Sequence, residues 1–363
     1  MDEANLPELP EEIYPLILCC LPVKSLIRFT CVSKSFHSLI LSDPKFAKSQ
    51  FQAARDRKSL TRRLLCAPPK AESIDLETPA FGNSSSAVTK LKVPFEDVHL
   101  LGSCNGIVLV VLDNYIFYMW NPSTGFWKKL PDREGASPSD NRLYSGFGYL
   151  PAMDDYRVFA SYFDYTPDDD EIEVGTVFSS RANTWETFEY DELAVASYEG
   201  VLVNETLHWH TYYHEIVAFD LAQQQDYKMR KTLLPKYLYD KGDDIQLSGG
   251  ERLHVVRVAT QMTPCIDVWV MTEYGSWTKL FNLKFSGPPK ERWRHTSCSV
   301  WVMETSTVFS IFTGDRDELV MIIFPENGHV DEQQDSKMFS CLKQEEIHSS
   351  GTANLYTHQM TGP

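Results

Sequence analysis

The chain has 363 residues, a length that allows two domains or one large domain with a small appendage. Hydrophobic residues make up 43% of it and aromatic residues 12%, which is enough for a packed core and unlike a disordered chain. The formal net charge of −16 argues against a general nucleic-acid binder, because such proteins need cations to displace phosphate counterions. We therefore expect a folded protein whose partners are not nucleic acids.

The cysteines and the N-terminal residues bear on the cellular compartment. Eight cysteines are scattered through the chain and none forms a Cys-x-x-Cys pair, so neither a zinc ribbon nor a thioredoxin-like site is predicted. The first thirty residues do not have the pattern of a signal peptide, and the longest apolar run, residues 107–112, is too short to cross a bilayer. We expect a protein of the reducing cytoplasm and/or nucleus, without membrane contact, whose sequons at Asn83 and Asn204 are chance matches.

Residues 9–51 have a helical period. Apolar residues recur at three- and four-residue spacing from Ile13 to Leu21, so they share one helix face. Pro22 ends this helix, and the Ser33 hydroxyl can cap a later one. Three or four short helices make a small core that is marginal alone, so this unit is expected to gain stability from a partner.

After residue 65 the pattern changes to short strands separated by Gly, Asn, Asp and Pro turns. An apolar strand, a polar turn and an aromatic residue recur together in four segments, residues 120–127, 178–185, 219–227 and 269–277. Their first aromatic residues are 58, 41 and 50 residues apart. A period of about 40 to 50 residues with four strands per unit is typical of kelch or WD-type propellers. The alternative is an irregular β-sandwich whose hairpins are similar by chance.

Particular motifs in both regions resemble a known family. Leu9–Ile13, Leu21–Leu26 and Cys31–Ser35 are similar to an F-box of the plant type. Further motifs follow in order and resemble the F-box-associated, kelch-like domain of plant F-box proteins, a group that includes S-locus F-box proteins and F-box repressors of plant defence. These motifs are Ser103–Ile107, Trp120–Thr124, Phe147–Tyr149 with Asp154–Val158, Leu207–Trp209, Ala218–Leu221 and Ser276–Leu280. The resemblance covers about residues 6–330.

The resemblance implies an α+β multidomain architecture, in which a small N-terminal helical F-box precedes an all-β kelch-like propeller of about six blades. We expect the following division of the chain: F-box helical domain 1–51, linker and first β strands 52–97, propeller 98–340, and a polar, partly disordered tail 341–363.

The same resemblance implies a binding function, in which this chain catalyses no reaction itself. Members of the family act as substrate receptors of Skp–cullin–F-box ubiquitin ligases: the F-box binds the Skp-type adaptor, and through it cullin, and the second domain binds the target protein. By position, the adaptor-binding residues are Leu9, Pro10, Ile13, Ile17, Leu21, Pro22, Leu26, Val32, Ser33 and Lys34. For Ile17 and Leu26, a place in the domain's own core is an equal alternative.

Two positions depart from the family pattern. Phe36 stands where the family usually has Trp, which keeps the apolar anchor but loses an indole donor. Asn204-Glu205 stands where the family often has Asn-Gly, which indicates a different turn before the Leu207–Trp209 strand.

No catalytic or cofactor motif survives inspection, and we expect no enzyme activity, metal or cofactor. Residues 247–251 are similar to the signature of transporter ATPases, but the chain has no phosphate-binding loop, so a turn between strands is favoured. His208, His210 and His214 are the right residue type for a metal site but lack a complete ligand set. The indoles of the β region are expected to be structural, in the core and between blades: Trp120, Trp127, Trp185, Trp209, Trp269 and Trp277.

Charge gives one clue to the target. Residues 1–65 have a net charge of +3, so the remainder has −19, which favours a basic target protein. Two other functions remain open: an adaptor-independent propeller scaffold that binds proteins or glycans, and a propeller enzyme such as a copper oxidase.

Overall fold

A computed structural model gives the structure of the protein. It describes residues 9–57, 60–66, 72–75, 88–91, 93, 98–113, 115–133, 144–165, 171–190, 194–224, 227–238, 244–259, 265–284, 298–302, 308–313, 319–324, 339–341 and 355–361. Four helices come first, and every later regular element except one short 3₁₀ helix is a strand in this described part of the chain. No helix among these residues is long and apolar enough to span a membrane.

The helical region comprises α1 (Ile13–Leu18), α2 (Val23–Phe29), α3 (Lys34–Ser42) and α4 (Pro44–Asp56). Side chains cap the last two helices: the Ser33 hydroxyl accepts a hydrogen bond from the Phe36 N–H at 3.1 Å, as predicted, and Asp43 accepts one from the Lys45 N–H at 2.8 Å. The Asp43-Pro44 pair thus opens a helix of 13 residues, and the helical region extends to Asp56 instead of ending at residue 51.

The core of the helical region is small. Leu18, Leu26 and Phe46 are its buried members, and a few partly buried side chains of α1 to α3 surround them. Two long-range hydrogen bonds hold α4 against the turn between α1 and α2: Gln50 Nε2 donates to the Leu21 carbonyl at 3.3 Å, and Arg57 donates to the Cys20 carbonyl at 2.9 Å.

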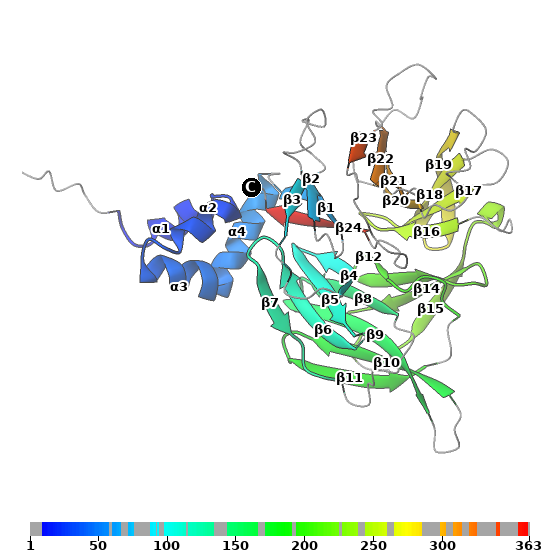
Figure 1. Cartoon of the computed structure of the whole chain (residues 1–363). Helices are drawn as coiled ribbons and strands as arrows, with labels where there is room; N and C mark the ends of the chain where they lie inside the picture. Colours follow the sequence, from blue (N-terminus) through cyan, green and yellow to red (C-terminus); the bar gives the residue numbers. More distant parts are fainter. Residues whose placement is uncertain are drawn as a thin grey trace, which may run out of the picture.

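The described strands of the β region form six antiparallel four-stranded sheets, grouped around a centre in Figure 1. This arrangement confirms the expected propeller of six blades and excludes the β-sandwich. In chain order the strands are β1 (Leu60–Cys66), β2 (Glu72–Asp75), β3 (Val88–Lys90), β4 (Val98–Cys104), β5 (Ile107–Leu112), β6 (Ile116–Asn121), β7 (Phe126–Lys129), β8 (Ser145–Leu150), β9 (Asp155–Tyr165), β10 (Glu171–Ser179), β11 (Thr184–Glu189), β12 (Val201–Val203), β13 (Thr206–His210), β14 (Glu215–Asp220), β15 (Met229–Leu233), β16 (Asp244–Ser248), β17 (His254–Ala259), β18 (Cys265–Glu273), β19 (Ser276–Lys284), β20 (Cys298–Val302), β21 (Val308–Thr313), β22 (Leu319–Phe324), β23 (Phe339–Cys341) and β24 (Leu355–Thr361).

The last strand of the chain completes the first sheet, whose order is β24-β1-β2-β3. Strand β24 pairs with the whole of β1, from Leu60 opposite Thr361 to Cys66 opposite Leu355. The expectation of a polar, partly disordered tail is therefore wrong for residues 355–361. The polar composition was misleading because strand pairing uses the backbone and needs no apolar run.

The predicted sequence repeat corresponds to one structural unit, the hairpin of the third and fourth strands of a sheet. Trp120 lies opposite Trp127 across β6 and β7, and their rings stack at 4.8 Å; Phe178 lies opposite Trp185 across β10 and β11. The next two sheets carry the repeat in the hairpins β14–β15 and β18–β19, but there Phe219 lies opposite Met229 and Trp269 lies opposite Lys279. The aromatic pair is thus a direct cross-strand contact in the second and third sheets only, among the described residues of these four sheets.

Every sheet has two chemically distinct ends. In an antiparallel sheet the turns from first to second strand and from third to fourth lie at one end, which we call the paired-turn end. The turn from second to third strand and the link to the next sheet lie at the other, which we call the link end. First strands of neighbouring sheets run in the same direction, because Ser145 at the start of β8 forms a parallel bridge with Glu199 just before β12.

Candidate functional site

The helical region exposes more apolar surface than its size leads one to expect. Val32 is 65% exposed, Leu16 62% and Leu9 50%. Ile17, Phe29 and Leu41 are exposed as well. Six exposed large apolar side chains in so short a helical region favour a protein-binding role for it.

The residues predicted to bind an adaptor do not all share this exposure. Seven of them are exposed: Leu9, Pro10, Ile17, Pro22, Val32, Ser33 and Lys34. Ile13 and Leu21 are half-buried, and Leu21 packs against the small core. Leu26 is 4% exposed and belongs to that core, which favours the alternative of an intramolecular role.

Sequence reasoning missed three of the exposed apolar residues, Leu16, Phe29 and Leu41. Helices of six to nine residues have too few turns for a helical period to separate a core face from a contact face. The excess of apolar residues was the available signal, and it pointed to the region but not to these side chains.

Phe36 takes the place where the family pattern has Trp. Its ring meets Tyr14 edge-on at 5.5 Å and Phe29 at 6.3 Å, so it joins α1, α2 and α3. Phe36 is half-buried, which lets it serve as an apolar anchor without an indole N–H.

An ion pair links the helical region to the β region at the paired-turn end. Lys48 of α4 lies 3.0 Å from the carboxylate of Asp154, in the turn between β8 and β9, and the Tyr149 hydroxyl donates to the same carboxylate. The Tyr149 hydrogen bond and Lys48 lower the pKa of Asp154. Both charged side chains are well exposed, so the pair positions the two regions more than it stabilises them.

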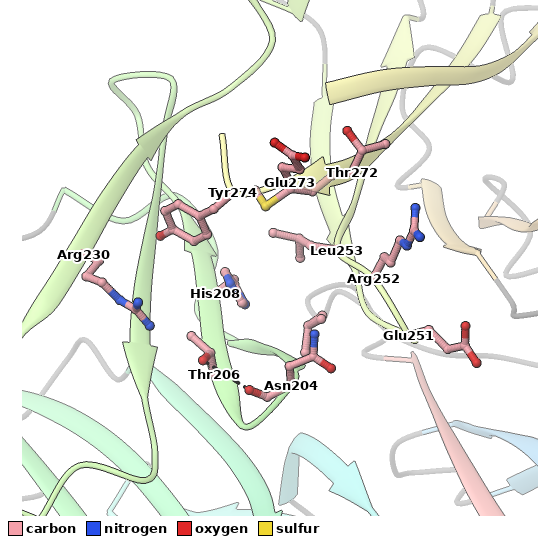
Figure 2. Close-up of a pocket in the computed structure, with 12 residues that line it drawn as sticks. Asn204, Thr206, His208, Arg230, Glu251, Arg252, Leu253, Thr272, Glu273 and Tyr274 are labelled. Carbon is pink, nitrogen blue, oxygen red and sulfur yellow. Dashed lines mark hydrogen bonds between the residues drawn. The ribbon is translucent and has the colours of Figure 1, made fainter. Parts of the chain in front are cut away.

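A pocket of about 320 Å³ opens at the paired-turn end, between the fourth sheet (β12–β15) and the fifth (β16–β19). Figure 2 shows Arg230 pointing toward His208 and Tyr274 across it. The Arg230 guanidinium lies 5.7 Å from the Tyr274 ring, a cation–π distance. Leu253 and Met271 contribute apolar walls.

The pocket has no pronounced charge, since Glu251 and Glu273 offset Arg230 and Arg252 around it. Burial lowers the pKa of His208 to about 4, so its imidazole is neutral at pH 7. Neutral His208 lies against the Val201 carbonyl, and the hydroxyl-bearing side chains of Thr206, Thr272 and Tyr274 line the same pocket. The arrangement is suited to holding a small polar group.

Two of the three histidines singled out by sequence, His208 and His210, are largely buried in the fourth sheet. Burial lowers the pKa of His210 to about 4 also, and no group of three potential ligands occurs among the described residues. Of residues 247–251, expected to be a turn, Leu247 and Ser248 end strand β16, and residues 249–251 lie between β16 and β17.

The six tryptophans lie in the sheets or against them. Trp120 and Trp209 are buried, and Trp127, Trp185, Trp269 and Trp277 are half-buried. Trp185 of the third sheet donates to the Pro131 carbonyl at 2.7 Å, and Trp277 of the fifth sheet donates to the Leu233 carbonyl at 3.1 Å. These two indoles therefore bridge neighbouring sheets.

Another link between sheets starts in the Asp154–Val158 motif. Arg157 of β9 donates to the carbonyls of Leu221 and Gln223 in the fourth sheet, each at 2.7 Å. Asp155 holds the guanidinium in place at 3.1 Å. The motif thus joins the third sheet to the fourth.

Comparisons with known proteins agree with this architecture. The model of the F-box domain matches residues 6–48, and the model of the F-box associated beta propeller domain matches residues 71–349. An F-box/kelch-repeat protein of Arabidopsis thaliana is 28% identical over 303 residues, 76% of this chain and 79% of the relative. The F-box/WD-40 repeat-containing protein 1 of the same plant is 24% identical, over 78% of this chain and 70% of that protein.

Among solved structures, one match is the SapL1 lectin in complex with alpha methyl fucoside. The matched region covers 77% of this chain and 92% of the lectin chain, with 9% identity and a TM-score of 0.43. The match to the six-bladed Aleuria aurantia lectin covers 74% of this chain and 93% of the lectin chain, with 10% identity and a TM-score of 0.40. Neither likeness bears on function. The family models, which together match most of the chain, confirm the resemblance seen in the sequence: the chain belongs to the plant-type F-box proteins that carry an F-box associated β-propeller domain.

Proposed function

We propose that this protein is the substrate-recognition subunit of a Skp–cullin–F-box ubiquitin ligase. The observation that carries the proposal is the exposed apolar surface of Leu9, Leu16, Ile17 and Val32 on a helical unit that matches the F-box. The remaining exposed positions of the adaptor-binding set, Pro10, Pro22, Ser33 and Lys34, belong to the same proposed surface.

In this proposal the β-propeller binds the target protein, and the proteasome degrades the target after it has been ubiquitinated. The chain needs no catalytic group for that role, because it acts by proximity: holding a target beside a charged conjugating enzyme makes transfer effectively intramolecular. We place the protein in the cytoplasm or nucleus, where such ligases act on folded targets, and expect cullin to join only through the adaptor.

Co-purification of the full chain with a Skp-type adaptor tests the proposal. Ile17→Asp and Val32→Asp place charges in the exposed apolar surface without entering the core, and each is expected to weaken adaptor binding at least ~100-fold. Leu233→Asp, at a 57% exposed position of the propeller, is the matched control and should bind as the wild type does. Failure of the wild type to bind, or equal binding by all four proteins, would contradict the proposal.

A further inference from the structure

The pocket between the fourth and fifth sheets has a buried apolar floor. Val203, Leu253 and Met271 line it and are 6%, 2% and 9% exposed. The buried polar residue among the lining residues is His208. Burial, with a smaller contribution from the Arg230 charge, lowers the pKa of His208 to about 4, so the floor carries no charge at pH 7. A floor of this kind favours a compact apolar group.

The mouth of the pocket is charged, and its charged side chains point in different directions. Arg230, Glu251, Arg252 and Glu273 are all exposed there. Figure 2 shows Arg230 pointing toward His208, whereas the carboxylates of Glu251 and Glu273 point away from it. The charges around the mouth cancel in number, but the charge that is directed into the pocket is positive.

The Tyr274 ring holds the Arg230 side chain at this position. The guanidinium lies 5.7 Å from the centre of the ring, and its charge opposes the burial that raises the pKa of Tyr274. No carboxylate forms an ion pair with Arg230 among the described residues, whereas Arg257 of the fifth sheet pairs with Asp267 at 2.7 Å. A guanidinium presents its N–H donors in a planar arrangement that matches a carboxylate. Arg230 therefore has donors available for a carboxylate from outside the chain.

The wall of the pocket beside His208 is fixed by its own hydrogen bonds. Asn204 and Glu205 form the turn between β12 and β13 with φ of 49° and 61°, a left-handed conformation that is uncommon for residues other than glycine. The Leu221 N–H donates to the Glu205 carbonyl at 3.0 Å, and the Thr206 hydroxyl donates to the Asn204 carbonyl at 3.3 Å. A wall that is already ordered loses little conformational entropy when a ligand binds.

We propose that this pocket binds a carboxylate joined to a compact apolar group. The carboxylate accepts hydrogen bonds from Arg230, and the apolar group lies on the floor of Val203, Leu253 and Met271. The volume of about 320 Å³ is near the lower end for ligand pockets, so the apolar group is about the size of one side chain.

Two sources supply this chemistry: the last residue of a protein chain that ends in an apolar side chain, and a free small acid. The proposal goes beyond the receptor role and does not depend on it. It assigns a binding site to the propeller and a chemical class to its ligand.

Fluorescence anisotropy with the full chain tests the proposal, using a labelled Gly-Gly-Gly-Leu peptide with a free C-terminal carboxylate. The same peptide with a C-terminal amide keeps the leucine but lacks the charge, and it should bind at least ~10-fold more weakly. A free-acid peptide of four glycines keeps the charge but leaves the floor unfilled, and it should be weaker by a similar factor.

N-acetyl-leucine distinguishes the two sources of the carboxylate. If it displaces the labelled leucine peptide at a concentration similar to that of the unlabelled peptide, the pocket accepts a free small acid. If the peptide binds and N-acetyl-leucine does not displace it, the pocket requires a chain terminus. Both results support a carboxylate site.

Variants of strand β15 test the role of Arg230. Arg230→Ala, at an exposed position, should weaken binding of the free-acid leucine peptide at least ~10-fold and change binding of the amide little. Arg230→Lys keeps the charge without the planar donors, so its affinity should fall between those two. Lys231→Ala is the matched control, because Lys231 is also exposed and strand alternation places it on the opposite face.

Three results would overturn the proposal: no binding of the free-acid leucine peptide at millimolar concentration, equal binding of the free-acid and amidated peptides, or equal binding by the wild type and Arg230→Ala. Adaptor co-purification with the same proteins tests the receptor role separately. Arg230→Ala should retain the adaptor, because Arg230 lies outside the residues that match the F-box. A wild type that fails to bind the adaptor contradicts the receptor role, whereas the peptide data judge the pocket by themselves.

Discussion

The helical region and the propeller use apolar residues in opposite ways. In the helical region three large side chains are buried and a larger number of apolar residues face solvent. In the propeller, continuous cores fill the spaces between neighbouring sheets, as Phe147, Val158 and Phe178 do between the second and third sheets. The exposed residues of the propeller that stand out are tyrosines in its connections.

This difference agrees with the different roles proposed for the two regions. A region that leaves its apolar residues exposed depends on a partner to cover them, which fits docking on a constant adaptor. A region that satisfies its own core can vary its connections without losing the fold, which fits recognition of a particular target. The following predictions are ordered from the largest expected effect to the smallest.

The buried ion pair of the propeller should be the most sensitive point. Asp155 is 3% exposed and binds Arg157, the Ser179 and Ser180 hydroxyls and the Arg181 N–H. Burial by itself raises the pKa of Asp155, but these donors outweigh it and leave the pKa below the usual value. Asp155→Ala strands the buried Arg157 charge and should cost about 3–5 kcal/mol in urea unfolding.

Asp155→Asn is the matched control, because it keeps the shape and part of the hydrogen bonding. Its loss of stability should be smaller than that of Asp155→Ala. Equal stability of wild type and Asp155→Ala would mean that the propeller does not depend on this link between sheets.

Acid should weaken the propeller in a defined pH window through His208. Its pKa is about 4 in the folded protein and about 6.5 when exposed, so below pH 6.5 the unfolded chain binds a proton that the folded one does not. Stability should therefore fall as the pH drops from about 6.5 to 4, by about 3 kcal/mol in total for this residue.

His208→Gln cannot take up that proton, so its unfolding free energy should be flatter across the same window. Urea unfolding at half-unit steps of pH measures the difference. Parallel curves for wild type and variant would show that His208 is not buried in its neutral form.

The core and the surface of the helical region should respond differently to the same deletion. Leu26 is buried, so Leu26→Ala leaves a cavity and should cost about 2 kcal/mol, near the low end for core leucines because the small domain can relax. Leu16→Ala, at a 62% exposed position, should change stability by less than about 0.5 kcal/mol but weaken adaptor binding. If Leu16→Ala costs as much stability as Leu26→Ala, then Leu16 belongs to the core and the exposed face of α1 has been assigned incorrectly.

The ion pair between the two regions should contribute least. Lys48 and Asp154 are both well exposed, so Lys48→Ala should leave the thermal midpoint of unfolding unchanged within error. A clear drop in the midpoint would show that the two regions stabilise each other through this contact.

The sequence allowed the architecture to be predicted because its signals are local. The Ser33 cap, the change of period near residue 65 and the aromatic residues that flank each hairpin turn are all visible within a few residues. The pairing of β24 with β1 joins residues almost 300 positions apart and leaves no local trace, so the closing strand was taken for a tail. Long-range pairing of this kind depends on closure of the ring of propeller sheets, and the composition of the strand does not reveal it.

The same limit applies to the binding surfaces. Leu16 and Leu26 are both leucines in short helices, and only packing makes one exposed and the other buried. The Tyr212 N–H donates to the Ala194 carbonyl, and this hydrogen bond joins two segments that the sequence cannot place side by side.

A variant that still binds target proteins but no longer binds the adaptor tests the receptor role most directly. In cells, full-length Ile17→Asp should capture the same proteins through its propeller as the wild type, without coupling them to the adaptor. The account predicts that these captured proteins have longer half-lives when Ile17→Asp replaces the wild type, to the extent seen with proteasome inhibition of the wild type. Captured proteins whose half-lives are the same with either form, and are unaffected by proteasome inhibition, would contradict it.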